Sequence, residues 1–210
     1  MEPLKEGHFY HIFNRGVNRT SIFFSHSDYK LFLKKYWFYM YIPCKTYCWC
    51  LLENHFHLLV KIREYQEQEQ IFQKIKRIYK TGKFFGDHYE CTKPFKAYTQ
   101  FSHLFNSYTK SINTQRNRSG TLFESTFKRK KILDENHLLN VACYIHRNPI
   151  HHNIINSYNS YPFSSFIEIL NMKNPLIEHE NLIKRFGGKD NFLKAHEEFR
   201  LLLGSEFYLE

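Results

Sequence analysis

The stretch Tyr47-Cys-Trp-Cys-Leu-Leu-Glu-Asn-His-Phe-His-Leu-Leu-Val-Lys-Ile62 decides the fold. Residues 47–52 and 55–62 are rich in strand-forming side chains, and Glu53-Asn54 between them is short and polar. We expect two strands joined by a tight turn or a bulge. Because side chains alternate between the faces of a strand, His55 and His57 point to the same side and Phe56 to the other.

The His55–His57 pair has two interpretations. Two imidazoles about 7 Å apart along a strand can hold one divalent ion when a third ligand comes from elsewhere. The chain has 13 histidines, however, so the pair can equally be two surface or hydrogen-bonded side chains. The pair alone leaves both interpretations open.

Further elements follow on either side of this stretch. Ser27 and Asp28 are good helix starters, and Pro43 stops the helix they begin. Asn148-Pro149 is expected to end the last helix of this region. The predicted elements are a strand over 8–14, helices over 29–40, 64–80 and 97–113, a loop over 81–95, a strand over 126–133 and a helix over 136–147.

With residues 64–96 set aside, the first six elements follow the split β-α-β pattern. We therefore predict an α+β fold, a ferredoxin-like antiparallel sheet with helices on one face, plus a C-terminal helical extension. Residues 1–150 form the core, with 64–96 as an insertion, and 151–210 form the extension packed on the core. Short helices are expected near 164–171, 178–186 and 189–202.

Composition narrows the class of partner. Thirty Lys and Arg against 20 Asp and Glu give a net charge of +10, which favours a nucleic acid or an anionic membrane surface. No run of about 18 apolar residues and no secretory signal is visible, so we expect a cytoplasmic protein without a membrane span. Five cysteines without a CxxC pair predict reduced, unpaired thiols.

A second group of polar side chains lies on the predicted helix over 136–147 and just beyond it. Tyr144 and Asn148 are four residues apart, so both lie on one helix face. An asparagine oxygen is a suitable third ligand for a hard or borderline cation, and a tyrosine one turn earlier can lean over that ion. The alternative is a tyrosine packed in the core and an asparagine that caps the helix before proline.

The order of five motifs resembles one family. The chain is similar to the single-tyrosine HUH transposases, and within them to the REP-associated tyrosine transposases and related small insertion-sequence transposases. The likeness spans roughly residues 7–170. The motifs are Asn14-Arg15-Gly16, Leu52-Glu-Asn-His-Phe-His-Leu-Leu59, Arg118-Ser-Gly-Thr-Leu-Phe123, Tyr144-Ile-His-Arg-Asn-Pro-Ile150 and Tyr161-Pro-Phe-Ser-Ser165.

The resemblance implies a reaction. Tyr144 is expected to be the nucleophile that cuts and rejoins single-stranded DNA through a 5′-phosphotyrosine, with Mg²⁺ or Mn²⁺ held by His55, His57 and Asn148. The expected partner is single-stranded DNA that forms hairpins. The protein is expected to be associated with the nucleoid, with a homodimer as one option for its oligomeric state. Two departures are Glu53, where the family usually has proline, and the long 64–96 stretch.

Basic residues near the motifs are candidates for DNA contact. The alternative for those on the predicted fourth strand is an edge strand protected from aggregation by its charges. The candidates are Arg15, Arg116, Arg118, Lys128, Arg129, Lys130 and Lys131.

Three other functions stay open at this point. A replication or relaxation nuclease of the same chemistry is disfavoured by the small size and the absence of a helicase segment. A non-catalytic single-stranded or hairpin DNA-binding protein of the same fold would use the same basic surface. A zinc-dependent hydrolase would release both DNA ends instead of keeping one on tyrosine.

Overall fold

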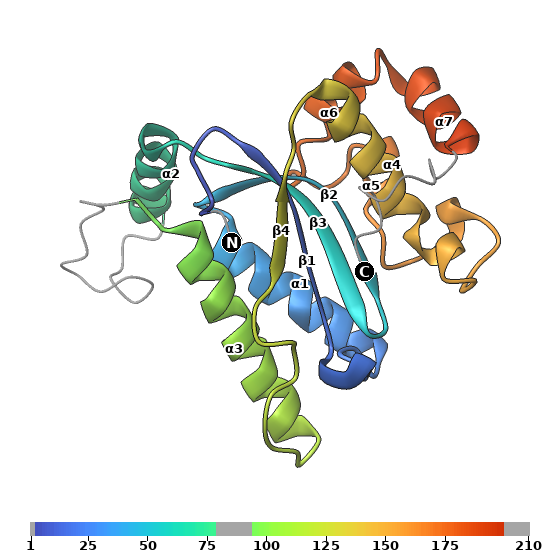
Figure 1. Ribbon diagram of the computed structural model, residues 1–210. Coiled ribbons are helices and arrows are strands. Elements are labelled where there is room, and N and C mark those ends of the chain that lie inside the picture. The colour runs from blue at the N-terminus through green and yellow to red at the C-terminus, as the bar shows by residue number, and fades with distance from the viewer. Residues whose placement is uncertain (1–2, 79–93, 200–210) are drawn as a thin grey trace.

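The computed structural model describes residues 3–78 and 94–199 (Figure 1). Four strands form one antiparallel sheet in the order β2-β3-β1-β4. This order confirms the predicted ferredoxin-like sheet, because the first strand of each half lies at its centre. The strands are β1 (Phe9–Arg15), β2 (Cys44–Leu52), β3 (His55–Ile62) and β4 (Lys128–Lys131).

The β2–β3 hairpin has the predicted form. Glu53 and Asn54 are the two turn residues, and Leu52 pairs with His55 directly across the turn. The register brings Cys50 opposite His57, on the same face of the sheet. The described cysteines are buried free thiols, as expected, at 44, 48, 50 and 143, and Cys91 lies outside the described residues.

Two helices cover one face of the sheet. Helix α1 (His26–Met40) and helix α3 (Ala97–Gln115) pack against each other there (Figure 1). The ring of Phe56 is fully buried between Phe32 and Phe105, with ring centroids 5.2 and 5.5 Å away. Burial of one such side chain contributes about 1.5–3 kcal/mol, so this aromatic layer is the main core.

Helix α4 (Glu135–His151) lies on the opposite face, against β2 and β3 (Figure 1). Its first turn is capped by Asp134, whose carboxylate accepts a hydrogen bond from the His137 amide at 2.8 Å. The predicted stop at Asn148-Pro149 is wrong, because the helix continues through both residues. Proline removes one helical hydrogen bond, but burial of Asn148 and Pro149 against the sheet offsets that loss.

The remaining elements are short or peripheral. The small apolar cluster of Ile42 and Phe72 anchors helix α2 in the predicted insertion. Helix α7 packs on α4, and the predicted fourth strand is shorter than expected, although the Ile132 amide still donates to the Phe9 carbonyl. These elements are α2 (Tyr65–Ile78), η1 (Val17–Arg19), η2 (Tyr158–Ser160), α5 (Phe166–Leu170), α6 (His179–Arg185) and α7 (Lys189–Glu198).

Some predictions concern parts of the chain without a described structure. Most of the loop expected over 81–95 falls there, as does the end of the last helix beyond 199. Within the described ranges, no helix combines the length and apolar character needed to cross a bilayer.

Candidate active site

The histidines of the motif lie on the sheet face that α4 covers. His57 on β3 and His11 on β1 are both buried, and the His11 Nε2 and His57 Nδ1 atoms are 2.9 Å apart. The His57 Nε2 atom is buried, and no described residue gives it a hydrogen-bond partner. Histidines that bind metals usually have one ring nitrogen held by a neighbour in this way and the other left for the ion.

The electrostatics keep these two imidazoles neutral. Burial lowers the pKa of His11 to about 3, and the nearby positive charge of Lys130 acts in the same direction. Burial also lowers the pKa of His57 well below its ordinary value, helped by the neighbouring imidazoles of His11 and His55. A neutral imidazole is the form that binds a metal ion.

His55 meets Asn148 across the gap between β3 and α4. The Asn54 amide nitrogen donates to the Arg19 carbonyl at 3.3 Å, which turns its oxygen towards His55 Nδ1, 2.6 Å away. The Nδ1 atom therefore carries a hydrogen that it donates to Asn54, and the Nε2 atom lies 3.0 Å from Asn148 Oδ1. This contact joins β3 to α4.

The spacing of these two atoms also allows one divalent cation to bind both. Adjacent ligands of an octahedral ion with bonds of about 2.1 Å stand about 3.0 Å apart. The rings of His55 and His57 have their centroids 5.1 Å apart, and the Asn148 amide nitrogen is buried without a described hydrogen-bond partner. Two imidazole nitrogens and one amide oxygen would be the ligand set for the Mg²⁺ or Mn²⁺ that the sequence predicted.

Over residues 3–78 and 94–199, no three His, Cys, Asp or Glu side chains gather at a point suited to a metal ion. Structural zinc sites take four ligands, usually from Cys and His.

Tyr144 reaches the same place from α4. Its ring centroid lies 5.5 Å from that of His57 and 6.0 Å from that of His11, and the side chain is 6% exposed. The helix continues through Asn148, so Tyr144 and Asn148 share a face as predicted. His146 points away from this face and bonds to His196 at 2.8 Å, so it is no general base for Tyr144.

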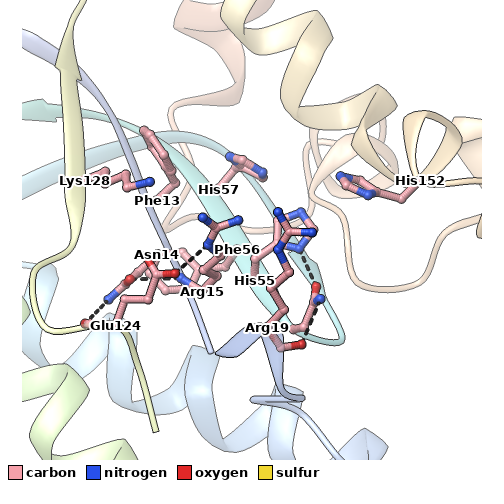
Figure 2. A pocket seen from close by; sticks show the side chains of 11 residues that line it. Phe13, Asn14, Arg15, Arg19, His55, Phe56, His57, Glu124, Lys128 and His152 are labelled. Carbon is pink, nitrogen blue, oxygen red and sulfur yellow. Dashed lines mark hydrogen bonds and ion pairs between the residues drawn. The ribbon is translucent and has the colours of Figure 1, made fainter. Parts of the chain in front are cut away.

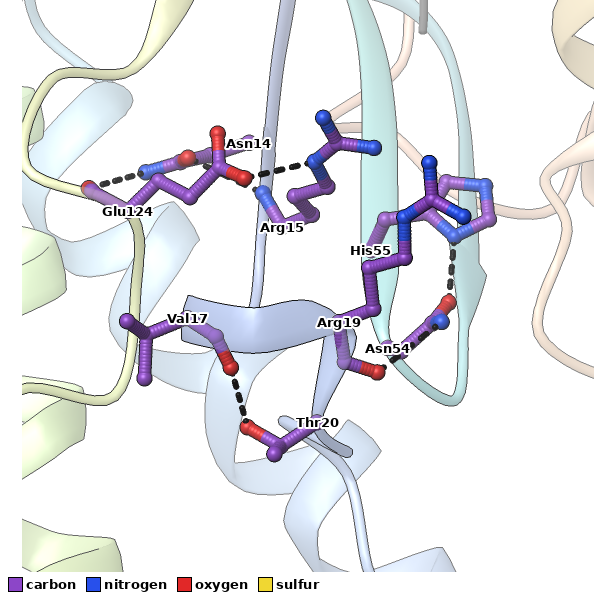
Figure 3. Close-up of polar contacts among 8 residues, drawn as sticks. All are labelled: Asn14, Arg15, Val17, Arg19, Thr20, Asn54, His55 and Glu124. Carbon is purple, nitrogen blue, oxygen red and sulfur yellow. Dashed lines mark hydrogen bonds and ion pairs between the residues drawn. The ribbon is translucent and has the colours of Figure 1, made fainter.

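A pocket opens beside the histidines (Figure 2). Arg15 and Lys128, both predicted to contact DNA, line it, and the Arg15 guanidinium forms an ion pair with Glu124 at 2.6 Å. Arg19 extends towards the His55 ring in Figures 2 and 3. The pocket is lined by Phe13, Asn14, Arg15, Arg19, Asn54, His55, Phe56, His57, Glu124, Lys128 and His152.

The basic residues of β4 divide between the two faces of the sheet. Lys130 pairs with His11 across the ladder and shares the histidine face with Lys128. Arg129 lies over the Tyr98 ring, 5.1 Å from its centroid, on the other face. Lys131 also belongs to that other face of the sheet and is half-buried.

The two predicted DNA-contact residues after α3 make contacts within the protein. The Arg116 guanidinium bonds to the buried Asp28 carboxylate at 3.0 Å and covers the Phe24 ring at 4.4 Å. Arg118 donates to the Thr121 carbonyl at 3.3 Å. Neither residue lines the pocket.

Comparison with known proteins supports the fold. No family model and no curated protein matches the chain. A solved structure of a REP-associated tyrosine transposase bound to a REP hairpin does match, with a TM-score of 0.56 and 13% identity. The match covers 84% of this chain and 87% of the other. The two chains share a fold.

Several residues of the pocket, or of the histidine site beside it, were not among the sequence predictions. His11 had a visible signal, because it occupies a predicted strand whose alternate residues share a face. The sequence gives no signal for Arg19, because the position of this residue depends on the backbone path of an irregular turn. His152 follows α4 and places its ring centroid 4.7 Å from that of His55, beyond the helix end that the sequence predicted.

Proposed function

We propose that the protein is a DNA transposase that cuts and rejoins single-stranded DNA through a covalent tyrosine intermediate. The observation that carries the proposal is the meeting of His55 and His57 on β3 with Tyr144 and Asn148 on α4. The shared fold with a hairpin-bound tyrosine transposase supports the same reaction class.

Tyr144 is the proposed nucleophile. Its phenolic oxygen attacks phosphorus, and the bond from phosphorus to the 3′-oxygen breaks, which leaves a 5′-phosphotyrosine and a free 3′-hydroxyl. The phenol gives up its proton, and the departing 3′-oxygen takes one up. Because the phosphotyrosine keeps the energy of the broken ester, a second 3′-hydroxyl can displace Tyr144 and rejoin the strand without ATP.

His55, His57 and Asn148 would hold Mg²⁺ or Mn²⁺ beside the nucleophile. A cation there supplies Lewis-acid withdrawal of charge from the scissile phosphate. The protein contributes fixed ligand directions, since His11 orients His57 and Asn54 orients His55. With Nδ1 held in this way, the Nε2 atom of each ring is the one that would bind the cation.

The strand-binding surface is proposed to begin at the pocket. Arg15 and Lys128 line it, and Lys130 continues the same face of β4. Positive charge of this kind binds phosphates collectively and makes affinity fall as salt rises. Hairpin DNA is the proposed partner, by analogy with the matched structure. Residues 1–150 are the proposed catalytic unit, and 151–210 the supporting extension.

A non-catalytic DNA-binding role is the second candidate. The site side chains His55, His57, Tyr144 and Asn148 are buried, as side chains with a purely structural role also are. The sequence identity to the matched transposase is 13%. Such a protein would bind single-stranded or hairpin DNA through the same basic surface without forming a covalent bond.

The deciding experiment uses Tyr144→Phe. The protein is incubated with a pool of labelled hairpin DNAs that carry single-stranded flanks, in the presence of Mn²⁺, and the products are separated under denaturing conditions. The wild type should carry label on the protein, and Tyr144→Phe should lose the adduct while its DNA affinity stays within about twofold. A phenylalanine keeps the ring contacts with His57 and removes only the hydroxyl.

The matched control is Tyr158→Phe, a buried tyrosine outside the site. It should form the adduct as the wild type does. An adduct that persists in Tyr144→Phe would refute the assignment of the nucleophile, and a wild type that binds DNA but forms no adduct would favour the second candidate.

A further inference from the structure

The turn after β1 has an unusual backbone. Asn18 and Arg19 are consecutive and both have positive φ, 53° and 59°, a region that residues other than glycine seldom adopt. Gly16 permits the turn, because a Cβ there would stand 1.9 Å from the Thr20 carbonyl oxygen. The turn is closed by a hydrogen bond from the Arg19 amide to the Gly16 carbonyl. The Thr20 hydroxyl also donates to the Val17 carbonyl (Figure 3).

The strained turn is tied to the histidine site. Asn54 donates to the Arg19 carbonyl at 3.3 Å and accepts from His55 Nδ1 at 2.6 Å (Figure 3). One side chain thus holds the backbone of Arg19 and the ring of His55 together. Strained residues that the surrounding structure fixes in this way are concentrated at functional sites.

The pocket beside His55 has an excess of positive charge. Of the cations that line it, Arg15 is paired with Glu124 at 2.6 Å. Across residues 3–78 and 94–199, no carboxylate forms an ion pair with Arg19 or Lys128. The charges of Arg15 and Glu124 cancel. The pocket therefore presents the positive charges of Arg19 and Lys128 next to His55, a candidate metal ligand.

We propose that Arg19 binds the non-bridging oxygens of the phosphodiester that enters between His55 and Tyr144. This inference rests on the proposed function and adds a residue to its substrate site. A guanidinium offers a planar pair of donors that matches two phosphate oxygens, which an ammonium group does not. The left-handed backbone at Arg19 is maintained because it directs this side chain to the pocket.

The variant that separates the two roles of Arg19 is Arg19→Gly. Glycine adopts positive φ without strain, so the fold should be as stable as the wild type or more stable, while the guanidinium is lost. Asn18→Gly is the matched control, since it relaxes the neighbouring left-handed residue and keeps Arg19. Lys30→Gln, on the exposed side of α1, controls for the loss of one charge.

The first measurement is a titration with inorganic phosphate, followed by the NMR signal of the His55 ring. Arg19→Gly should weaken phosphate binding at least tenfold, whereas Asn18→Gly and Lys30→Gln should stay within twofold of the wild type. Arg19→Lys should bind phosphate more weakly than the wild type, because an ammonium group keeps the charge but not the planar pair of donors of the guanidinium. Wild-type affinity in Arg19→Gly, or no phosphate binding by the wild type, overturns the proposal.

The second measurement distinguishes a nucleic-acid phosphodiester from free phosphate. A thymidine pentanucleotide is compared with the same oligomer carrying neutral methylphosphonate linkages. The wild type should prefer the charged oligomer, and Arg19→Gly should lose at least tenfold of that preference. An unchanged preference contradicts the proposal.

These binding measurements are independent of the covalent reaction. If no tyrosine adduct forms but Arg19→Gly loses phosphate and the preference for charged linkages, the transposase function fails and the phosphate site stands. If the adduct forms and Arg19→Gly binds normally, the function stands and the role of Arg19 is refuted.

Discussion

Acid should destabilise this fold through His196, a histidine that does not line the pocket. His196 on α7 is fully buried, its Nδ1 donates to the Phe192 carbonyl at 2.7 Å, and its Nε2 faces His146 Nδ1 at 2.8 Å. These contacts are all satisfied by neutral rings. Burial lowers the pKa of His196 to about 4 in the folded protein. In the unfolded chain, histidine titrates near pH 6.5.

The direction in which pH changes the free energy of unfolding follows from the number of protons bound by the folded and the unfolded protein. Between about pH 6.5 and 4 the unfolded chain binds a proton at His196 and the folded protein does not, so unfolding becomes more favourable as pH falls. The stabilisation is complete above pH 6.5 and is lost towards pH 4. Integrated from pH 7 to pH 5, these two pKa values give a loss of about 2 kcal/mol in the free energy of unfolding.

The assay is urea unfolding at pH 7 and pH 5, followed by tryptophan fluorescence, for the wild type and His196→Gln. Glutamine can keep a donor and an acceptor but does not titrate. Buried histidines that do not contact His196 respond to pH in both proteins and cancel in the comparison, whereas His146, which contacts His196, contributes to the difference. The wild type should lose about 2 kcal/mol more than the variant. Equal losses would refute a neutral His196 in the folded state.

Three further predictions concern single contacts. His11→Phe should weaken Mn²⁺ binding about 10- to 100-fold by calorimetry, because the His57 ring, a proposed metal ligand, loses its orienting partner; an unchanged affinity would remove this role. Gly16→Ala should lower the free energy of unfolding by about 3 kcal/mol, since its Cβ meets the Thr20 carbonyl, and a wild-type urea midpoint would contradict that clash. Arg116→Ala should destabilise the fold by about 1.5–3 kcal/mol by leaving the buried Asp28 carboxylate without its guanidinium. Its thermal midpoint should fall while affinity for single-stranded DNA changes less than twofold; the reverse result would assign Arg116 to DNA.

The sheet was predictable because its signals are local. The alternation in 55–62 and the polar pair Glu53-Asn54 specify a hairpin whatever lies around it. The pairing of distant strands followed from the element order, since the split β-α-β pattern has few ways to form one sheet. The side-chain directions of His55, His57 and Tyr144 were also predictable from simple periodicity, and the structure brings these residues together.

The missed features depend on tertiary contacts. Asn148-Pro149 resembles a helix end by local rules, but burial against β2 and β3 carries the helix through it. The role of His11 requires the register of β1 on β3, which sets its ring against His57. Arg19 reaches the pocket only because two successive residues take left-handed conformations, and no periodic pattern announces such a turn.

The sheet keeps its two sides chemically separate. The side under α1 and α3 is packed with aromatic rings, whereas Tyr144 and Asn148 approach from α4 on the reverse side. Removing the Tyr144 hydroxyl or the Arg19 side chain leaves the rings beneath α1 untouched. If Tyr144 is the nucleophile, as proposed, the Tyr144→Phe protein should stay folded and hold an uncut DNA strand for crystallisation.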